Sequence, residues 1–171
     1  DADGSSSMKV SGPMIDSGQV TSFFWAPKGK RIAFRAEAEV LGRFELFAVD
    51  PDGSDRVKLN GPLVAGGDVA SYSWSPKGTE LSYRADEETD EVVELFVVRK
   101  DGTKRRKVSA PLVTGGDVNN VVWSPQGSRI LYRADAVTDE INELFVVRPD
   151  GSHHVRVRGD LPPGITVSFT G

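Results

Sequence analysis

The sequence predicts an all-β protein of the β-propeller class, and two observations indicate it. A block of 49 residues occurs three times, with Trp25, Trp74 and Trp123 inside the recurring phrases WAPKGKRIAFRAE, WSPKGTELSYRAD and WSPQGSRILYRAD. Each block contains short runs of aromatic and β-branched residues bounded by turn residues, which is typical of strands. Periods of about 40 to 50 residues occur in propeller blades and in helical repeats, but no segment has the sustained 3.6-residue apolar period of a helix.

The middle copy illustrates the elements expected in each block. A first strand is expected at 69–75, and the Ser-Pro-Lys-Gly turn after it combines the fixed φ of proline with the positive φ that glycine allows. A second strand is expected at 80–86 and a third at 94–99. An Asp-Gly hairpin turn then leads to a fourth, polar strand at 103–109. Four short strands joined by turns predict one antiparallel sheet per block.

The polarity of these strands indicates how the sheets are arranged. In the third strand Leu95 and Phe96 are adjacent, as are Val97 and Val98, so both faces of the strand are apolar. A sheet that lies between two other sheets needs this pattern, whereas the charged fourth strand suits an exposed edge. A radial stack of four-stranded sheets is a β-propeller, in which each blade depends on its neighbours.

The phase of the repeat divides a single repeat domain, residues 1–171, into about three and a half blades. Residues 1–11 match 148–158 and are interpreted as the outer strand of a preceding blade. Complete blades are expected at 12–60, 61–109 and 110–158, and the inner strand of a further blade at 159–171. Closed propellers have about four to eight blades. Either further sequence or copies of this chain, two of which carry about seven blades, must therefore complete the ring.

Composition excludes several function classes. The net charge of −4 does not suggest nucleic acid as a partner, and the basic run at 104–107 occurs in one copy only. There is no cysteine, which excludes disulfides, thiolate catalysis and zinc sites built from cysteine. No apolar run approaches the length of a membrane span.

The phrase WSPKGTELSYRAD followed by ELFVVRKDGTKRRKVS resembles the TolB-like propeller repeat. The core of that repeat is W-S-P-D-G, an I-A-F strand and an L-[FY]-V-V-[DN]-x-D-G hairpin. The resemblance extends from about Asp1 to Arg158, but Lys28, Lys77 and Gln126 replace the aspartate of S-P-D-G, and the loop between the second and third strands is longer than usual. The family binds protein partners in the bacterial envelope, and the same blade occurs as a non-catalytic domain ahead of peptidases. The resemblance therefore implies a periplasmic or extracellular location.

Acidic loops offer a candidate metal site. The loop at 85–94 contains Asp86 and Asp90, and the corresponding loop of the third copy keeps Asp135 and Asp139. Alternating oxygen donors suit Ca²⁺, but the glycine of the calcium-loop pattern is absent. A solvated hairpin loop is the main interpretation, and weak Ca²⁺ binding is the alternative.

Two further sets of residues recur with the period. Each second strand contains an arginine and each third strand opens with a glutamate, which suggests three cross-strand ion pairs; a ring of arginines around a ligand-binding mouth is the alternative. These residues are Arg35, Arg84 and Arg133, and Glu45, Glu94 and Glu143. Asp68 and Asp117 follow Gly-Gly and are expected to turn the chain into the first strand, with a ligand role as the alternative.

No catalytic set is recognisable, because the chain has no G-x-S-x-G motif and no phosphate-binding glycine loop. The sequence therefore predicts a protein that is not an enzyme and needs no cofactor. The function expected is a binding or scaffold module for protein–protein interaction, which forms a homo-oligomer or associates with missing blades. The alternative is the propeller domain of a larger peptidase or hydrolase, where it gates or positions substrate.

Overall fold

The computed structural model describes residues 7–157, which form twelve strands and no helix. Their bounds are β1 Val20–Trp25, β2 Ile32–Ala36, β3 Glu45–Val49, β4 Val57–Lys58, β5 Val69–Trp74, β6 Glu80–Ala85, β7 Glu94–Arg99, β8 Arg106–Lys107, β9 Val118–Trp123, β10 Ile130–Ala134, β11 Glu143–Val147 and β12 Val155–Val157. Within residues 7–157, no helix is long and apolar enough to cross a membrane.

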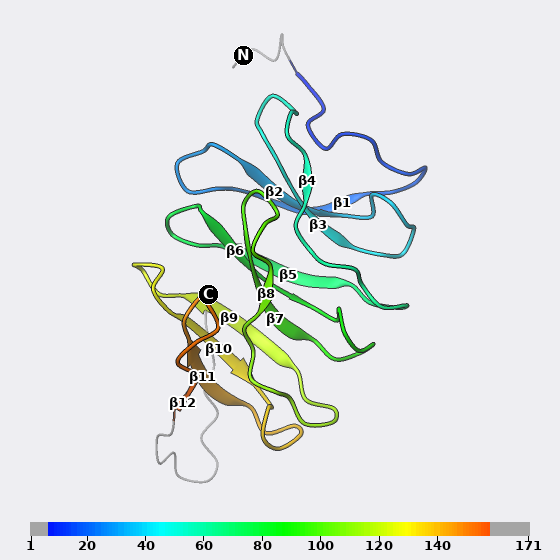
Figure 1. Cartoon of the computed structure of the whole chain (residues 1–171). Helices are drawn as coiled ribbons and strands as arrows, with labels where there is room; N and C mark the ends of the chain where they lie inside the picture. Colours follow the sequence, from blue (N-terminus) through cyan, green and yellow to red (C-terminus); the bar gives the residue numbers. More distant parts are fainter. Residues whose placement is uncertain (1–6, 158–171) are drawn as a thin grey trace.

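The strands form three four-stranded antiparallel sheets, each a simple meander in chain order. We call them blade 1 (β1–β4), blade 2 (β5–β8) and blade 3 (β9–β12). Figure 1 shows them stacked in this order from the blue end of the chain to the orange end. The register of each sheet repeats: Trp25 pairs with Ile32, Trp74 with Leu81 and Trp123 with Ile130. The predicted all-β propeller architecture is confirmed.

Apolar cores fill the spaces between the blades. One core combines Leu46 and Ala48 of blade 1 with Tyr83 and Phe96 of blade 2, all of them buried. A second combines residues of blades 2 and 3. Because apolar side chains on both faces of blade 2 are buried, this sheet is held from two sides. Each junction between blades also encloses a stacked aromatic pair, such as Tyr83 and Phe96 at 5.3 Å between ring centres.

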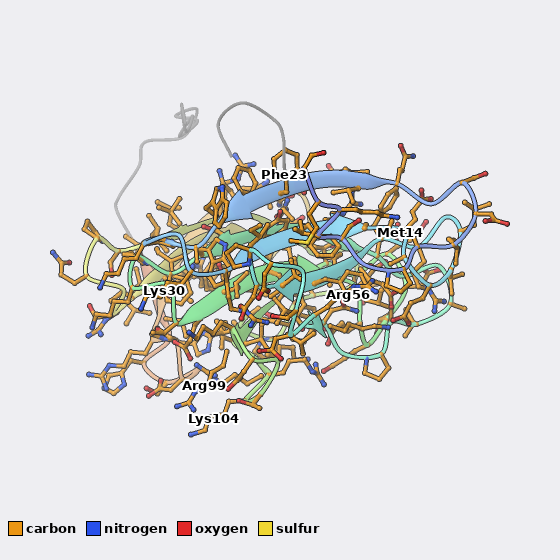
Figure 2. The ribbon with its side chains drawn as sticks, turned by 90° about the horizontal axis from the view of Figure 1, so that it is seen from above. Met14, Phe23, Lys30, Arg56, Arg99 and Lys104 are labelled. Atoms are coloured by element: carbon orange, nitrogen blue, oxygen red, sulfur yellow. The ribbon has the colours of Figure 1, made fainter. Side chains whose placement is uncertain are left out.

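The two sides of the stack differ. Phe23 of β1 lies at one side of the molecule, and Arg99 and Lys104 of the β7–β8 hairpin lie at the opposite side (Figure 2). The first strand of blade 1 and the hairpin between the third and fourth strands of blade 2 therefore lie on opposite sides of the stack. Gly102 has a φ of +80° in this hairpin, as the predicted Asp-Gly turn requires.

The fourth strands are shorter than expected. The polar strand predicted at 103–109 is reduced to β8, in which only Arg106 and Lys107 pair with β7. Residues 7–19 contain no strand, so of the outer strand expected at 1–11 the described part, 7–11, is irregular. Residues 1–6 and the inner strand expected at 159–171 lie outside the described residues.

Candidate binding faces and the blade junctions

The recurring tryptophans occupy equivalent positions at the end of each first strand. Trp74 is 9 % exposed, and its indole nitrogen donates to the carbonyl of Phe24 in blade 1 at 3.3 Å. Trp123 is 8 % exposed and donates to the hydroxyl of Ser82 in blade 2 at 2.8 Å. Trp25 is 56 % exposed. Its place in the repeat predicts that Trp25 also packs between two blades. This prediction is wrong, because no sheet among residues 7–157 lies on that side of β1.

Two of the recurring arginines connect neighbouring blades. Arg35 donates through Nε to the carbonyl of Val69, the first residue of β5. The guanidinium of Arg84 donates to the carbonyls of Val118 and Asn119 in β9, both at 2.8 Å. Burial lowers the pKa of both arginines below the usual value, although Asp68 and Asp117 respectively oppose the shift. Both groups remain protonated at neutral pH, so each is a charged donor held at a junction.

Arg133 differs from the other two. Its Nε is buried and has no hydrogen-bond partner among residues 7–157. Arg133 lies on β10 of blade 3, which has no following blade in the described chain. A buried charged donor without an acceptor costs free energy. Among the three recurring arginines, Arg133 is therefore the one whose Nε has no partner within residues 7–157, whereas the Nε atoms of Arg35 and Arg84 both donate.

The predicted ion pairs between these arginines and the recurring glutamates are wrong. The register pairs Ala36 with Glu45 and Arg35 with Leu46, so the arginine and the glutamate point to opposite faces of the sheet. Glu45 instead accepts from Lys58 at 2.7 Å. The corresponding pairs are Glu94 with Lys107 and Glu143 with Arg156. Each cation stands 13 residues after its glutamate, a recurrence that is visible in the sequence.

These ion pairs lie within a blade, at its outer strands. Burial by itself lowers the pKa of Lys58, but the hydrogen bonds to Glu39 and Glu45 and the negative charges of these two residues together outweigh burial and raise the pKa above its usual value. Lys107 shows the same balance with Glu88 and Glu94. These pairs tie the fourth strand to the third, so we assign the recurring glutamates a structural role.

Asp68 and Asp117 join adjacent blades. The Asp117 carboxylate accepts from the backbone N–H of Val93 in blade 2 at 2.7 Å, and the carbonyl of Val93 accepts from the N–H of Val118 at 2.8 Å. Phe44 makes the same two bonds with Asp68 and Val69. The aspartate is thus a clasp between the loop of one blade and the first strand of the next. The Gly-Gly before each aspartate predicts its place at the strand entry, but no pattern in the sequence indicates this contact.

The acidic loops use their carboxylates for backbone hydrogen bonds. Asp135 is 7 % exposed and accepts from the N–H groups of Asp117 and Glu140. Asp86 accepts from the N–H of Asp68. The carboxylates of Asp90 and Asp139 pack against Gly66 and Gly115, where a Cβ would meet a carboxylate oxygen at 2.5 Å and 2.9 Å. Among residues 7–157, no three acidic or histidine side chains are grouped to hold a metal ion.

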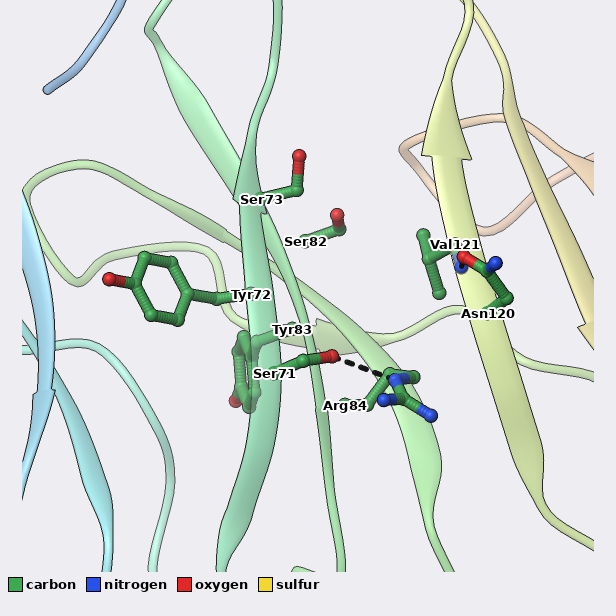
Figure 3. Close-up of a pocket in the computed structure, with 8 residues that line it drawn as sticks. All are labelled: Ser71, Tyr72, Ser73, Ser82, Tyr83, Arg84, Asn120 and Val121. Carbon is green, nitrogen blue, oxygen red and sulfur yellow. Dashed lines mark hydrogen bonds between the residues drawn. The ribbon is translucent and has the colours of Figure 1, made fainter. Parts of the chain in front are cut away.

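A small polar pocket opens between blades 2 and 3 (Figure 3). Arg84 extends toward β9 and donates to the Ser71 hydroxyl at 2.8 Å, while Tyr72 points the other way and donates to the carbonyl of Ala33 in blade 1. The pocket has a volume of about 70 Å³. Ligand pockets usually measure about 300–1,000 Å³, so this one has room for water rather than for an organic ligand.

Comparisons with known proteins agree on the fold. No family model matches the sequence, and no curated protein matches it. A putative TolB from Agrobacterium tumefaciens has a similar structure, with a TM-score of 0.60, 19 % identity, and coverage of 81 % of this chain and 46 % of that chain. An oligogalacturonate lyase in complex with manganese has a TM-score of 0.58 and 16 % identity, with coverage of 86 % of this chain and 39 % of that chain. A puromycin hydrolase has a TM-score of 0.56 and 18 % identity, with coverage of 82 % of this chain and 22 % of that chain.

The stacked meander sheets and these neighbours define a β-propeller fold. The fold is TolB-like, as the recurring sequence phrase predicts. The chain spans less than half the length of these solved structures.

Proposed function

We propose that this chain is a non-catalytic β-propeller module that binds protein and mediates assembly. The blades form a rigid stack, held at each junction by an apolar core, an arginine and an aspartate clasp. Protein is the partner class, a homo-oligomer is the assembly, and no cofactor takes part. Following the resemblance to TolB-like repeats, we propose a periplasmic or extracellular location.

One observation carries this proposal: the exposure of Trp25. Its counterparts Trp74 and Trp123 are almost fully buried by the preceding blade, whereas Trp25 is 56 % exposed beside Phe23, which is 70 % exposed. Large aromatic side chains that gather on one exposed face are typical of protein interaction sites. The face of β1 therefore supports binding to another protein.

A second candidate function is the propeller domain of a larger enzyme, which gates or positions substrate. The likeness to a puromycin hydrolase, of which the chain covers 22 %, favours this candidate. The complete gene product distinguishes the two, because a hydrolase domain in the same polypeptide would favour the enzyme.

Photocrosslinking tests the proposed function. In one variant, a photoreactive benzophenone amino acid replaces Trp25, and crosslinking is carried out in the cells that produce the protein. A matched variant carries the same amino acid at Leu41, an exposed apolar residue in the loop between β2 and β3. We expect a covalent protein adduct from position 25 and none from position 41. A folded protein that gives no adduct at position 25 would contradict the proposal.

A further inference from the structure

We infer that the exposed faces of blades 1 and 3 are the two halves of one blade junction, and that a second copy of this chain brings them together in a closed ring. This inference rests on the proposed protein-binding function and names its partner. The blade 1 face is defined by Phe23 and Trp25. The blade 3 face is defined by Val122, Leu131, Arg133 and Leu144.

The blade 1 face repeats a surface that is buried in blade 2. Phe23 and Trp25 stand 49 residues before Tyr72 and Trp74. Tyr72 and Trp74 both donate hydrogen bonds to carbonyls of blade 1 and contribute to the core between the two blades. The same two positions of blade 1 are 70 % and 56 % exposed. Blade 1 thus presents the aromatic half of a junction.

The blade 3 face repeats the other half. Leu46 of blade 1 and Leu95 of blade 2 are fully buried because the next blade covers them. Leu144, at the corresponding position of blade 3, is only partly buried. Val122 is 49 % exposed. Blade 3 thus presents the aliphatic half of a junction. It also carries Arg133, whose buried Nε has no acceptor among residues 7–157.

The hydrogen-bonding groups of the two faces also match. Arg35 and Arg84 donate to the carbonyl of the first residue in the next first strand, Val69 and Val118. Val20, the first residue of β1, is the residue of blade 1 that corresponds to Val69 and Val118 in the repeat. In the assembly, Arg133 therefore donates to the carbonyl of Val20 in the second copy.

Trp25 takes its acceptor from the junction of blades 1 and 2, because the blade 3 counterpart of Ser82, the acceptor of Trp123, is Leu131 and has no polar side chain. Trp74 donates to the carbonyl of Phe24, and the corresponding residue of blade 3 is Val122. Trp25 therefore donates to the carbonyl of Val122 in the second copy. The two faces supply each other's missing donors and acceptors, as well as each other's apolar contacts.

A second copy satisfies both faces of both chains. Each chain has one face of each kind, so two chains related by a twofold axis form two identical junctions and leave no face uncovered. The three sheets described in each chain then account for six blades of the ring, within the range of about four to eight blades for closed propellers. A ring also removes the exposed end sheets that a single stack retains.

The oligomeric state of the full chain tests this inference. Light scattering on a size-exclusion column at micromolar concentration is expected to give twice the chain mass of 18.5 kDa. Trp25→Glu and Arg133→Glu each place a carboxylate in both junctions and are expected to raise the dissociation constant by about 100-fold or more. Leu41→Glu changes an exposed loop residue outside the two faces and is expected to leave the dimer intact.

Mixing the two variants provides the sharper result. A pair formed from Trp25→Glu and Arg133→Glu has one junction with no substitution, so the mixture is expected to dimerise at a concentration where each variant alone is monomeric. Near-ultraviolet circular dichroism, which reports the packing of Trp74 and Trp123, checks that both variants are folded.

Several results would overturn the inference. The first is a wild-type chain that is folded but monomeric. The second is a dissociation constant of the dimer that neither Trp25→Glu nor Arg133→Glu raises. The third is a mixture of the two variants that does not dimerise. An adduct between position 25 and a different protein would also exclude the second copy, while leaving the proposed protein-binding function in place. The absence of any adduct from a folded protein would remove both.

Discussion

The indole nitrogen of Trp123 donates a hydrogen bond to the Ser82 hydroxyl at 2.8 Å, and this bond joins blade 3 to blade 2. A buried indole N–H needs an acceptor, and here the acceptor belongs to the neighbouring sheet. Trp74 uses a backbone carbonyl of blade 1 for the same purpose. Because the tryptophans of blades 2 and 3 each contact the preceding sheet, we expect the stability of the chain to depend on its junctions.

Truncation of Trp74 tests that expectation. We expect Trp74→Ala to lower the free energy of unfolding by about 3–5 kcal/mol, because it removes a large buried side chain and leaves a cavity between blades. Urea denaturation followed by circular dichroism measures the change. Val155→Ala, which truncates a side chain that is 55 % exposed on β12, is the control and should change stability by less than about 0.5 kcal/mol. Equal losses in the two variants would mean that Trp74 does not stabilise the junction.

The fold was largely predictable because each strand signal occurs three times. The sequence predicts the third strand of the middle copy at 94–99, and the structure has β7 at Glu94–Arg99, since an apolar run between charged and turn residues has bounds that are easily recognised. The fourth strand was overpredicted at 103–109. Only Phe96 and Val97 of β7 have partners in β8, so the backbone pairing is shorter than the charged stretch of sequence that predicts the strand.

The junction contacts could be predicted only in part, because they depend on register and on which blade is the neighbour. Arg35 and Glu45 recur together, but the register directs them to opposite faces of the sheet. The true partner of Glu45 is Lys58, and the constant spacing of 13 residues is the signal that would have indicated it. No pattern in the sequence shows that Asp68 binds Phe44 of another blade.

Arg84 provides a second test of the junctions. We expect Arg84→Met to lower the free energy of unfolding by about 1.5–3 kcal/mol, because the carbonyls of Val118 and Asn119 lose a charged donor. Arg99→Met, on an exposed residue at the end of β7, is the matched control and should have little effect. Urea midpoints measure both changes. If the two substitutions cost the same, the contact with β9 contributes nothing.

The aspartate clasp is tested at Asp117. Asp117→Ala leaves the N–H of Val93 without its acceptor, so we expect a loss of about 1–3 kcal/mol in the free energy of unfolding. Native-state hydrogen exchange should show faster exchange at Val93 than in the wild type. Asp16→Ala, in the exposed turn before β1, serves as the control. Unchanged protection of Val93 would show that the clasp is not formed in solution.

The acidic loops are predicted not to bind Ca²⁺. The side chains of Asp86 and Asp135 are buried, and each carboxylate already accepts a hydrogen bond from a backbone N–H group. Occupied carboxylates of this kind are not available as a ligand set for a cation that needs six to eight oxygens. Isothermal titration with excess Ca²⁺ should therefore give no heat beyond dilution. A saturable heat that Asp135→Asn abolishes would assign the loops to metal binding instead.

The hairpin aspartates predict how stability changes with acid. The Thr103 hydroxyl and N–H both donate to the Asp101 carboxylate, at 2.7 and 3.0 Å, and these bonds lower the pKa of Asp101 below its usual value of 3.8. Asp52 and Asp150 make the same bonds with Ser54 and Ser152. A carboxyl whose pKa is lower in the folded state contributes stability above its unfolded pKa, and this contribution is lost as the pH falls through the folded value.

Asp101→Asn is expected to remove the contribution of one hairpin to the pH dependence of stability. Asparagine keeps the oxygen acceptor but has no charge, so the wild type should be more stable than the variant at about pH 6, and the difference should shrink at about pH 2.5. Urea midpoints at the two pH values measure the difference. Thr103→Val removes the hydroxyl donor and should also weaken the pH dependence, because the side-chain hydrogen bond is the largest cause of the lowered pKa. A difference between wild type and Asp101→Asn that stays constant from about pH 6 to about pH 2.5 would show that the charge of Asp101 does not stabilise the hairpin.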